Sequence, residues 1–237
     1  MLVNPGARED NSTGAARKSG WLIVAMVCAA CMCMGWVDAV LRPGYAAKSA
    51  VKLALFLGLP ALYACFDRSF SPRALLRVDR SGLRIALCAG AVVYAVVMAA
   101  FLLLRRVFDF SALTVNLTAQ TGVDRGNFLW VALYISFVNS WLEEFFFRGF
   151  AFLTLKRAVG RGFAYVFSAG AFAAYHAAMM LGWFSPVLLL LALAGLFLGG
   201  AVFDRFDEER GNIWLSWLVH LCANFATNTV GFILFAA

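Results

Sequence analysis

Residues 127–154, NFLWVALYISFVNSWLEEFFFRGFAFLT, form an apolar segment that carries three charged side chains within six residues, Glu143, Glu144 and Arg148. As a helix this segment would reach about 40 Å, enough to cross a bilayer core of about 30 Å. Each charge costs about 2.5–3.5 kcal/mol at the centre of a membrane helix. The segment tolerates such charges only where they pair or meet water, so we expect it to pack inside a bundle of other helices.

The composition of the whole chain supports a membrane protein. Hydrophobic residues make up 63% of the 237 residues and charged residues only 14%, and the mean hydropathy is +0.81. Soluble domains are about 45–50% apolar and about 25% charged. The net charge of +7 comes from cations in short loops between apolar runs, which argues against nucleic acid as a partner and for contact with the lipid bilayer.

The apolar runs predict an all-α fold, a polytopic transmembrane helical bundle with seven spans. Residues 107–124 could lie along the membrane interface or add an eighth span, and the sequence leaves both open. Residues 1–20 are polar and small and are predicted to be a disordered tail, so residues 21–237 should form a single transmembrane domain. The seven spans are predicted at 21–41, 51–66, 82–104, 127–154, 161–180, 183–203 and 212–236.

The three charges of the opening segment do not all lie on one face of a helix. At about 100° per residue, Glu144 and Arg148 are about 40° apart and close enough to form an ion pair. Glu143 and Arg148 are about 140° apart and do not share that pair. One carboxylate therefore neutralises the arginine, while Glu143 is predicted to stay free and face a cavity, where it could act as an acid or a base.

Both histidines of the chain also lie inside apolar segments. His176 follows Phe172 by four residues, and Asn224 follows His220 by four, so each pair shares one helix face. A free carboxylate, two imidazoles and a carboxamide can deprotonate a water molecule and stabilise an oxyanion. Because no serine or cysteine stands at a matching position as a nucleophile, a water nucleophile is the simpler hypothesis.

Three motifs resemble, in order and spacing, those of the CAAX protease and bacteriocin-processing family. This family consists of glutamic-type intramembrane endopeptidases and includes the type II CAAX prenyl endopeptidases. The resemblance covers about residues 127–230, the expected catalytic core, and the family usually has eight helices. The three motifs are Glu143-Glu144-x-x-x-Arg148, Phe172-x-x-x-His176 and His220-x-x-x-Asn224.

The resemblance implies a role for each motif residue. Glu143 with His176 would activate the water, and His220 with Asn224 would form the oxyanion site. It also implies hydrolysis of a peptide bond in a membrane-associated protein or peptide, prenylated or carrying a sorting tag. No cofactor is expected, and the location expected is the plasma membrane of a prokaryote. The residues that would shape the cavity are Glu144, Arg148 and Phe172.

Two other functions stay open at this point. His176, His220 and a glutamate could bind a catalytic zinc ion, because His₂Glu sets do serve zinc, although the sequence contains no H-E-x-x-H motif. Buried carboxylates could also serve a proton-coupled transporter or a non-catalytic membrane scaffold. Near the motifs, Asn139, Trp141 and Asn228 are expected to pack around the site. The charged run at residues 204–210, DRFDEER, is predicted to be a solvated loop with local ion pairs.

Overall fold

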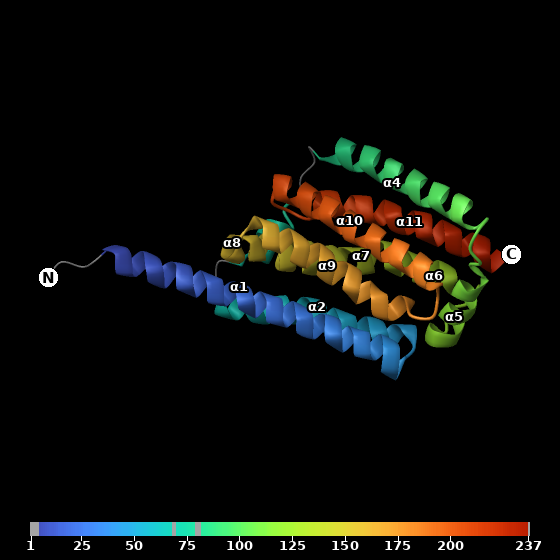
Figure 1. Cartoon of the computed structure of the whole chain (residues 1–237), viewed down its shortest axis with the longest axis horizontal. Coiled ribbons are helices and arrows are strands. Elements are labelled where there is room, and N and C mark those ends of the chain that lie inside the picture. The colour runs from blue at the N-terminus through green and yellow to red at the C-terminus, as the bar shows by residue number, and fades with distance from the viewer. Residues whose placement is uncertain (1–4, 68–69, 79–81, 237) are drawn as a thin grey trace.

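The computed structural model describes residues 5–67, 70–78 and 82–236, and side chains from Arg17 onward. Within these residues every regular element is a helix and no strand occurs. Figure 1 shows the long helices packed side by side with similar tilts, and α4 lies along α11 at one edge. The predicted all-α helical bundle is confirmed.

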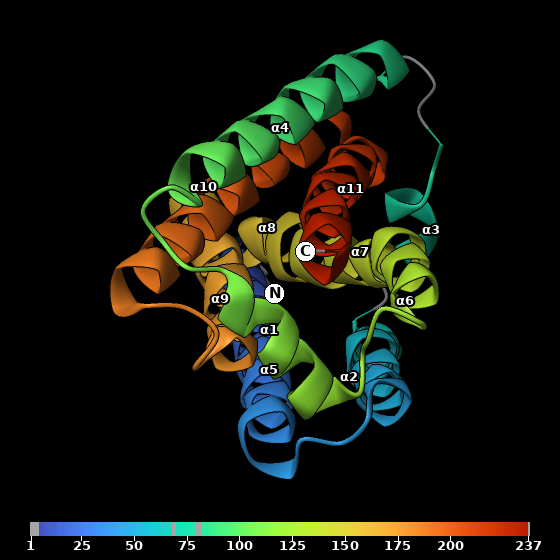
Figure 2. The same ribbon diagram turned by 90° about the vertical axis from the view of Figure 1, so that its right-hand side faces the viewer.

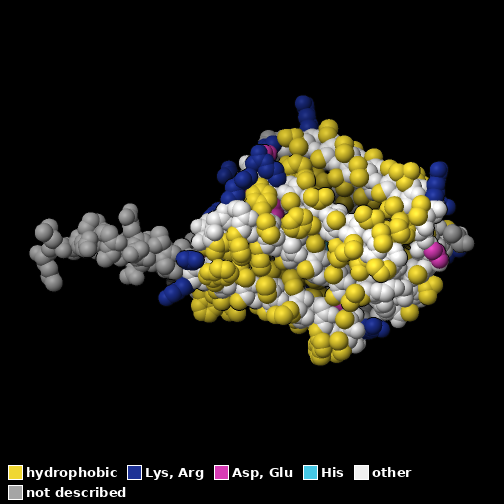
Figure 3. Space-filling model, viewed as in Figure 1, with side chains coloured by type: hydrophobic (Ala, Val, Ile, Leu, Met, Phe, Trp, Pro, Cys, Tyr) yellow, Lys and Arg dark blue, Asp and Glu magenta, His cyan; other side chains and the backbone are white. Residues whose placement is uncertain are grey.

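Six helices in the described part of the chain are long and apolar enough to cross a membrane. They match six of the seven predicted spans, and large apolar side chains cover their outer faces. Figure 3 shows hydrophobic side chains over the flank of the bundle, with Lys and Arg standing out at its edges. The six helices are α1 (Pro5–Trp36), α2 (Tyr45–Phe66), α4 (Leu83–Leu104), α9 (Arg161–Met180), α10 (Pro186–Arg210) and α11 (Trp214–Ala236).

The remaining predicted span is a helical run that changes between α-helical and the wider π-helical winding. Residues 142–153 of this run are all buried, and its long π-helical part contacts α1, α2, α3, α9 and α10. It is therefore the central helix of the bundle, enclosed by protein as its charges require. Its parts are α6 (Phe128–Tyr134), η2 (Ile135–Asn139), α7 (Ser140–Glu143), η3 (Glu144–Thr154) and α8 (Leu155–Val159).

Short helices occupy the ends of the bundle. Helix α5 (Ser111–Thr121) has 11 residues, which gives a length of about 16 Å, too short for a bilayer core of about 30 Å. Figure 2 shows it crossing one end of the bundle. The side chain of Asn116 donates to Gly182 O at 3.0 Å, and Trp183 Nε1 donates to Gln120 Oε1 at 3.0 Å. Residues 107–124 thus add no eighth span. The other two short helices are η1 (Val37–Leu41) and α3 (Pro72–Leu75).

The first helix begins before the predicted transmembrane domain. The backbone of residues 5–20, where a polar tail is predicted, is already helical. Figure 1 shows this part of α1 extending beyond the other helices. Residues 1–4 of the predicted tail lie outside the described residues, and the boundary between tail and transmembrane domain stays a prediction.

Aromatic rings fix the central helix against its neighbours. The ring of Phe56 on α2 stacks on that of Phe146, with centroids 4.1 Å apart. Phe147 meets Phe172 of α9 edge to face at 5.4 Å, and Phe150 meets Tyr63 of α2 at 5.3 Å. Such pairs add about 0.5–1.5 kcal/mol each beyond the apolar area that they bury. This packing sets the position of the glutamates that begin the same helical segment.

Candidate active site

Glu143 and Glu144 lie where α7 ends and η3 begins, at the centre of the bundle. Glu143 is 2% exposed and Glu144 is fully buried. Helix α9 places His176 beside them, and helix α11 places His220 there. The carboxylates and imidazoles of the predicted site therefore come together from three segments of the chain.

The imidazole of His220 forms a hydrogen bond with the carboxylate of Glu144. Its Nδ1 lies 2.7 Å from Glu144 Oε1, and because a carboxylate accepts, we assign the proton to Nδ1 as donor. The opposite atom, Nε2, lies 3.7 Å from Glu143 Oε2. Glu144 thus orients the imidazole and leaves its basic nitrogen facing Glu143, a contact that the sequence analysis did not predict.

His176 has the same arrangement on the other side of Glu143. Its Nδ1 donates to the main-chain oxygen of Phe172 at 2.8 Å, and its Nε2 lies 3.9 Å from Glu143 Oε1. Both gaps to Glu143 exceed the usual hydrogen-bond range of about 2.7–3.2 Å. A water molecule that donates to both atoms of such a pair would have to sit beside the line that joins them.

Arg148 is fully buried and forms the predicted ion pair with Glu144, with Nε 3.4 Å from Oε2. Its Nε also lies 3.7 Å from Asp204 Oδ1, and its guanidinium carbon is 4.1 Å from the ring centroid of Phe172. The guanidinium nitrogens donate no hydrogen bond to the described residues. Charge and ring contacts hold it instead, and Gly200 makes room, because a Cβ there would lie 3.0 Å from Arg148 Nη2.

The prediction of a solvated loop at residues 204–210 is wrong. Helix α10 continues to Arg210, and Asp204 and Asp207 are fully buried. Ser168 donates to Asp204 at 2.9 Å, and Ser216 donates to Asp207 at 2.8 Å. The spacing of three residues puts both carboxylates on the inner face of α10, while Arg205 and Glu209 pair on its exposed face.

The prediction that Glu143 stays free of a cationic partner is also wrong. Lys52 of α2, only 4% exposed, forms an ion pair with Glu143 Oε1. The side-chain nitrogen of Asn139 donates to the same oxygen at 3.0 Å. The sequence analysis missed Lys52, although a lysine inside the apolar run 51–66 was a signal that could have revealed it.

Asn224, the remaining polar residue of the predicted site, makes its hydrogen bond to the backbone of the central helix. Its Nδ2 donates to the main-chain oxygen of Ile135 at 3.1 Å. Asn228, one turn further along α11, donates to the main-chain oxygen of Ala132 at 3.1 Å and to Ser136 Oγ at 2.9 Å. The two carboxamides thus tie α11 to the start of the central helix.

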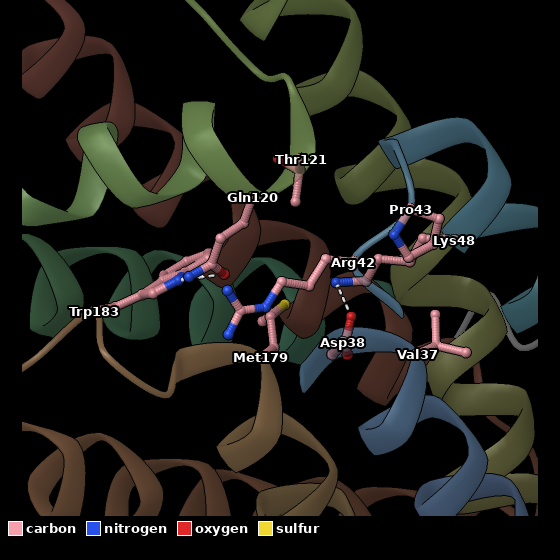
Figure 4. Close-up of a pocket in the computed structure, with 9 residues that line it drawn as sticks. All are labelled: Val37, Asp38, Arg42, Pro43, Lys48, Gln120, Thr121, Met179 and Trp183. Atoms are coloured by element: carbon pink, nitrogen blue, oxygen red, sulfur yellow. Dashed lines mark hydrogen bonds and ion pairs between the residues drawn. The ribbon is translucent and has the colours of Figure 1, made fainter. Parts of the chain in front are cut away.

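A small pocket lies near Lys52, at the end of the bundle where η1 meets α2. Figure 4 shows Lys48 paired with Asp38 and Trp183 bonded to Gln120 in this pocket. Lys48 precedes Lys52 by four residues on α2, so the pocket lies about one helical turn from the Glu143 pair. Its lining residues are Val37, Asp38, Arg42, Pro43, Lys48, Gln120, Thr121, Met179 and Trp183.

Glutamate and histidine are residue types that can bind a zinc ion, so the arrangement of the cluster decides whether it could do so. In the part of the chain that the structure describes, no group of three or more His, Cys, Asp or Glu residues is arranged to hold a metal ion.

Comparison with known families identifies the region that carries the site. Residues 125–226 match the family described as type II CAAX prenyl endopeptidase, Rce1-like. The match includes Glu143, His176 and Asn224, and it excludes Lys52. No curated protein and no solved structure matched the chain. The chain therefore carries an Rce1-like domain of the CAAX protease family, and the family resemblance predicted from its motifs is confirmed.

Arg148→Met should strongly destabilise the fold, because it leaves buried Glu144 and Asp204 without their cation. Breaking a buried ion pair in this way costs about 3–5 kcal/mol. The matched control is Arg205→Met, which removes an arginine whose side chain is 55% exposed and pairs with Glu209. That loss should cost about 1 kcal/mol or less. Equilibrium unfolding in detergent micelles measures both, and equal losses would contradict the ion-pair assignment.

Proposed function

We propose that the protein is a glutamic-type intramembrane endopeptidase that hydrolyses a peptide bond in a membrane-associated protein. The observation that supports this most is the convergence of two imidazole Nε2 atoms on the Glu143 carboxylate, at 3.9 and 3.7 Å. The cluster lies at the centre of the bundle, in a domain that matches a family of proteases. The name of that family suggests substrates that end in a CAAX sequence and carry a prenyl group.

In the proposed reaction a water molecule between Glu143 and the histidines attacks the carbonyl carbon of the substrate. One proton of the water passes to Glu143, its oxygen bonds to the carbon, and the carbonyl electron pair moves onto the carbonyl oxygen. When the oxyanion re-forms the double bond, the C–N bond breaks, and the proton held by Glu143 passes to the leaving nitrogen. No covalent enzyme intermediate is needed.

His220 has two functions in this proposal. The bond from its Nδ1 to Glu144 fixes the tautomer with a basic Nε2 and stabilises the imidazolium that forms when Nε2 takes from Glu143 the proton of the water, as in other carboxylate–histidine pairs. While Nε2 holds this proton it can donate to the oxyanion, and the proton then returns through Glu143 to the leaving nitrogen. Glu144 therefore orients a histidine in addition to pairing with Arg148.

Asn224 remains a candidate oxyanion donor. A carboxamide nitrogen has two N–H groups, and the contact with Ile135 uses one of them. The second N–H is available to a substrate. Asn224 would then contribute one donor beside His220, a contribution typically worth about 10²–10³-fold in rate.

Glu143→Gln should lower cleavage of a fluorogenic prenylated CAAX peptide by about 10²–10⁴-fold, because an amide cannot take the proton of the water. The assay uses the purified full chain in proteoliposomes, with the unprenylated peptide as a comparison. The matched control is Glu209→Gln on α10, whose side chain is 47% exposed and which should keep full activity. Full activity of the Glu143 variant would remove this residue from the role of base.

Cleavage of the same peptide should survive prolonged treatment with strong chelators, because the proposed base and donors are all side chains. The measurement compares initial rates before and after chelation, and after addition of zinc. A loss of cleavage that zinc restores would contradict this proposal and favour a zinc-dependent intramembrane metalloprotease. If the protein moved protons across the liposome membrane but did not cleave the peptide, that result would instead favour a transporter.

A further inference from the structure

We propose that Lys52 is a positioning residue for Glu143: it holds one carboxylate oxygen and keeps the group ionised, so that the other oxygen serves the water. This inference rests on the proposed function. It assigns a part in the reaction to α2, a helix outside the stretch 125–226 that matches the protease family.

The ammonium group of Lys52 is held between two helices. It donates to Glu143 Oε1 and to Asn139 Oδ1. Its nitrogen lies 4.8 Å from the ring centroid of Tyr175 and 5.3 Å from that of Phe56. Because the side chain is 5% exposed, little of the charge is left to water, and the carboxylate is its main compensation.

The two oxygens of Glu143 are consequently different. Oε1 accepts from Lys52 and, at 3.0 Å, from Asn139. Oε2 accepts no hydrogen bond from the described residues and faces His220 Nε2 at 3.7 Å. Two donors on one oxygen fix the rotation of the carboxylate. Each oxygen faces one imidazole, Oε1 that of His176 and Oε2 that of His220, but within the described part of the chain only Oε2 is left without a donor and can accept from an attacking water.

Lys52 is also the residue whose positive charge compensates the carboxylate of Glu143. Arg148 pairs with Glu144 and Asp204 instead, and neutral imidazoles supply no charge. A buried carboxylate that loses its cation takes up a proton, and a protonated Glu143 cannot act as the base. The titratable groups around Glu143 are Lys52 and Tyr45 of α2, His176 and Tyr175 of α9, His220 of α11 and Glu144 beside it.

The test is Lys52→Met, assayed with the prenylated CAAX peptide in proteoliposomes. We expect kcat to fall by about 10–100-fold, as is typical when a supporting partner of a reactive group is lost, with KM little changed. Activity needs ionised Glu143, so the acid limb of the pH profile should move to higher pH. Lys52→Arg should restore most of the rate, because a guanidinium can donate to the same oxygen.

The matched control is Lys48→Met. Lys48 lies one turn earlier on the same helix and also pairs with a buried carboxylate, that of Asp38. Its loss removes the same charge at a neighbouring depth without touching Glu143, so kcat and the pH profile should stay as in the unmodified protein. An equal effect of both variants would show a general effect of charge and overturn the proposal.

A spectroscopic readout keeps the test valid if Lys52→Met folds poorly. Infrared difference spectra against the unmodified protein at neutral pH should show an additional carbonyl stretch of a protonated carboxyl in Lys52→Met. That band should be missing in Lys52→Met/Glu143→Gln, which removes both charges together and should regain stability. The band reports on Glu143 directly and is independent of any cleavage.

The outcomes separate the two proposals. If Glu143→Gln is inactive while Lys52→Met keeps the normal kcat, pH profile and infrared spectrum, the inference about Lys52 fails and the proposed function stands. If the unmodified protein cleaves no peptide but the protonated band appears in Lys52→Met, the proposed function fails. The conclusion that Lys52 keeps Glu143 ionised would then still stand.

Discussion

The structure depends on placing charge inside a bundle whose outer surface is apolar. Glu143, Glu144, Asp204 and Asp207 are all buried, and a low-dielectric interior makes each unpaired carboxylate costly. Lys52 pairs with Glu143, and Arg148 pairs with Glu144 and Asp204. Asp207 accepts a hydrogen bond from Ser216 instead. The central helix can carry the site only because α2, α9, α10 and α11 bring compensating groups to it.

The same pairing produces the chemistry that we propose. Lys52 and Asn139 occupy one oxygen of Glu143, and Glu144 and the Phe172 carbonyl each bind the Nδ1 of a histidine. The remaining carboxylate oxygen, Oε2, faces His220 Nε2, and His176 Nε2 faces Oε1; both gaps are longer than a direct hydrogen bond. A site of this kind is preorganised to hold and deprotonate water, because its reactive groups are already oriented by bonds on their far sides.

Helical periodicity in the sequence was enough to predict which polar side chains within one helix lie close together. The spacing of Glu144 and Arg148 predicted their ion pair, and the motifs predicted the family that residues 125–226 match. Lys52 was missed because its pair with Glu143 joins residues 91 positions apart, and a pattern within one helix says nothing about its partners on another. Asp204 and Asp207 were taken for loop residues because charges on both faces of α10 hide its buried face in the sequence.

The central claim is that water attacks the substrate directly while Glu143 only carries a proton. A single turnover in ¹⁸O-labelled water tests this most directly, followed by mass spectrometry of the product and of the enzyme peptide that contains Glu143. The account predicts ¹⁸O in the new carboxyl end of the product and none in the Glu143 peptide. Incorporation of ¹⁸O into Glu143 would reveal a covalent anhydride intermediate and contradict the account.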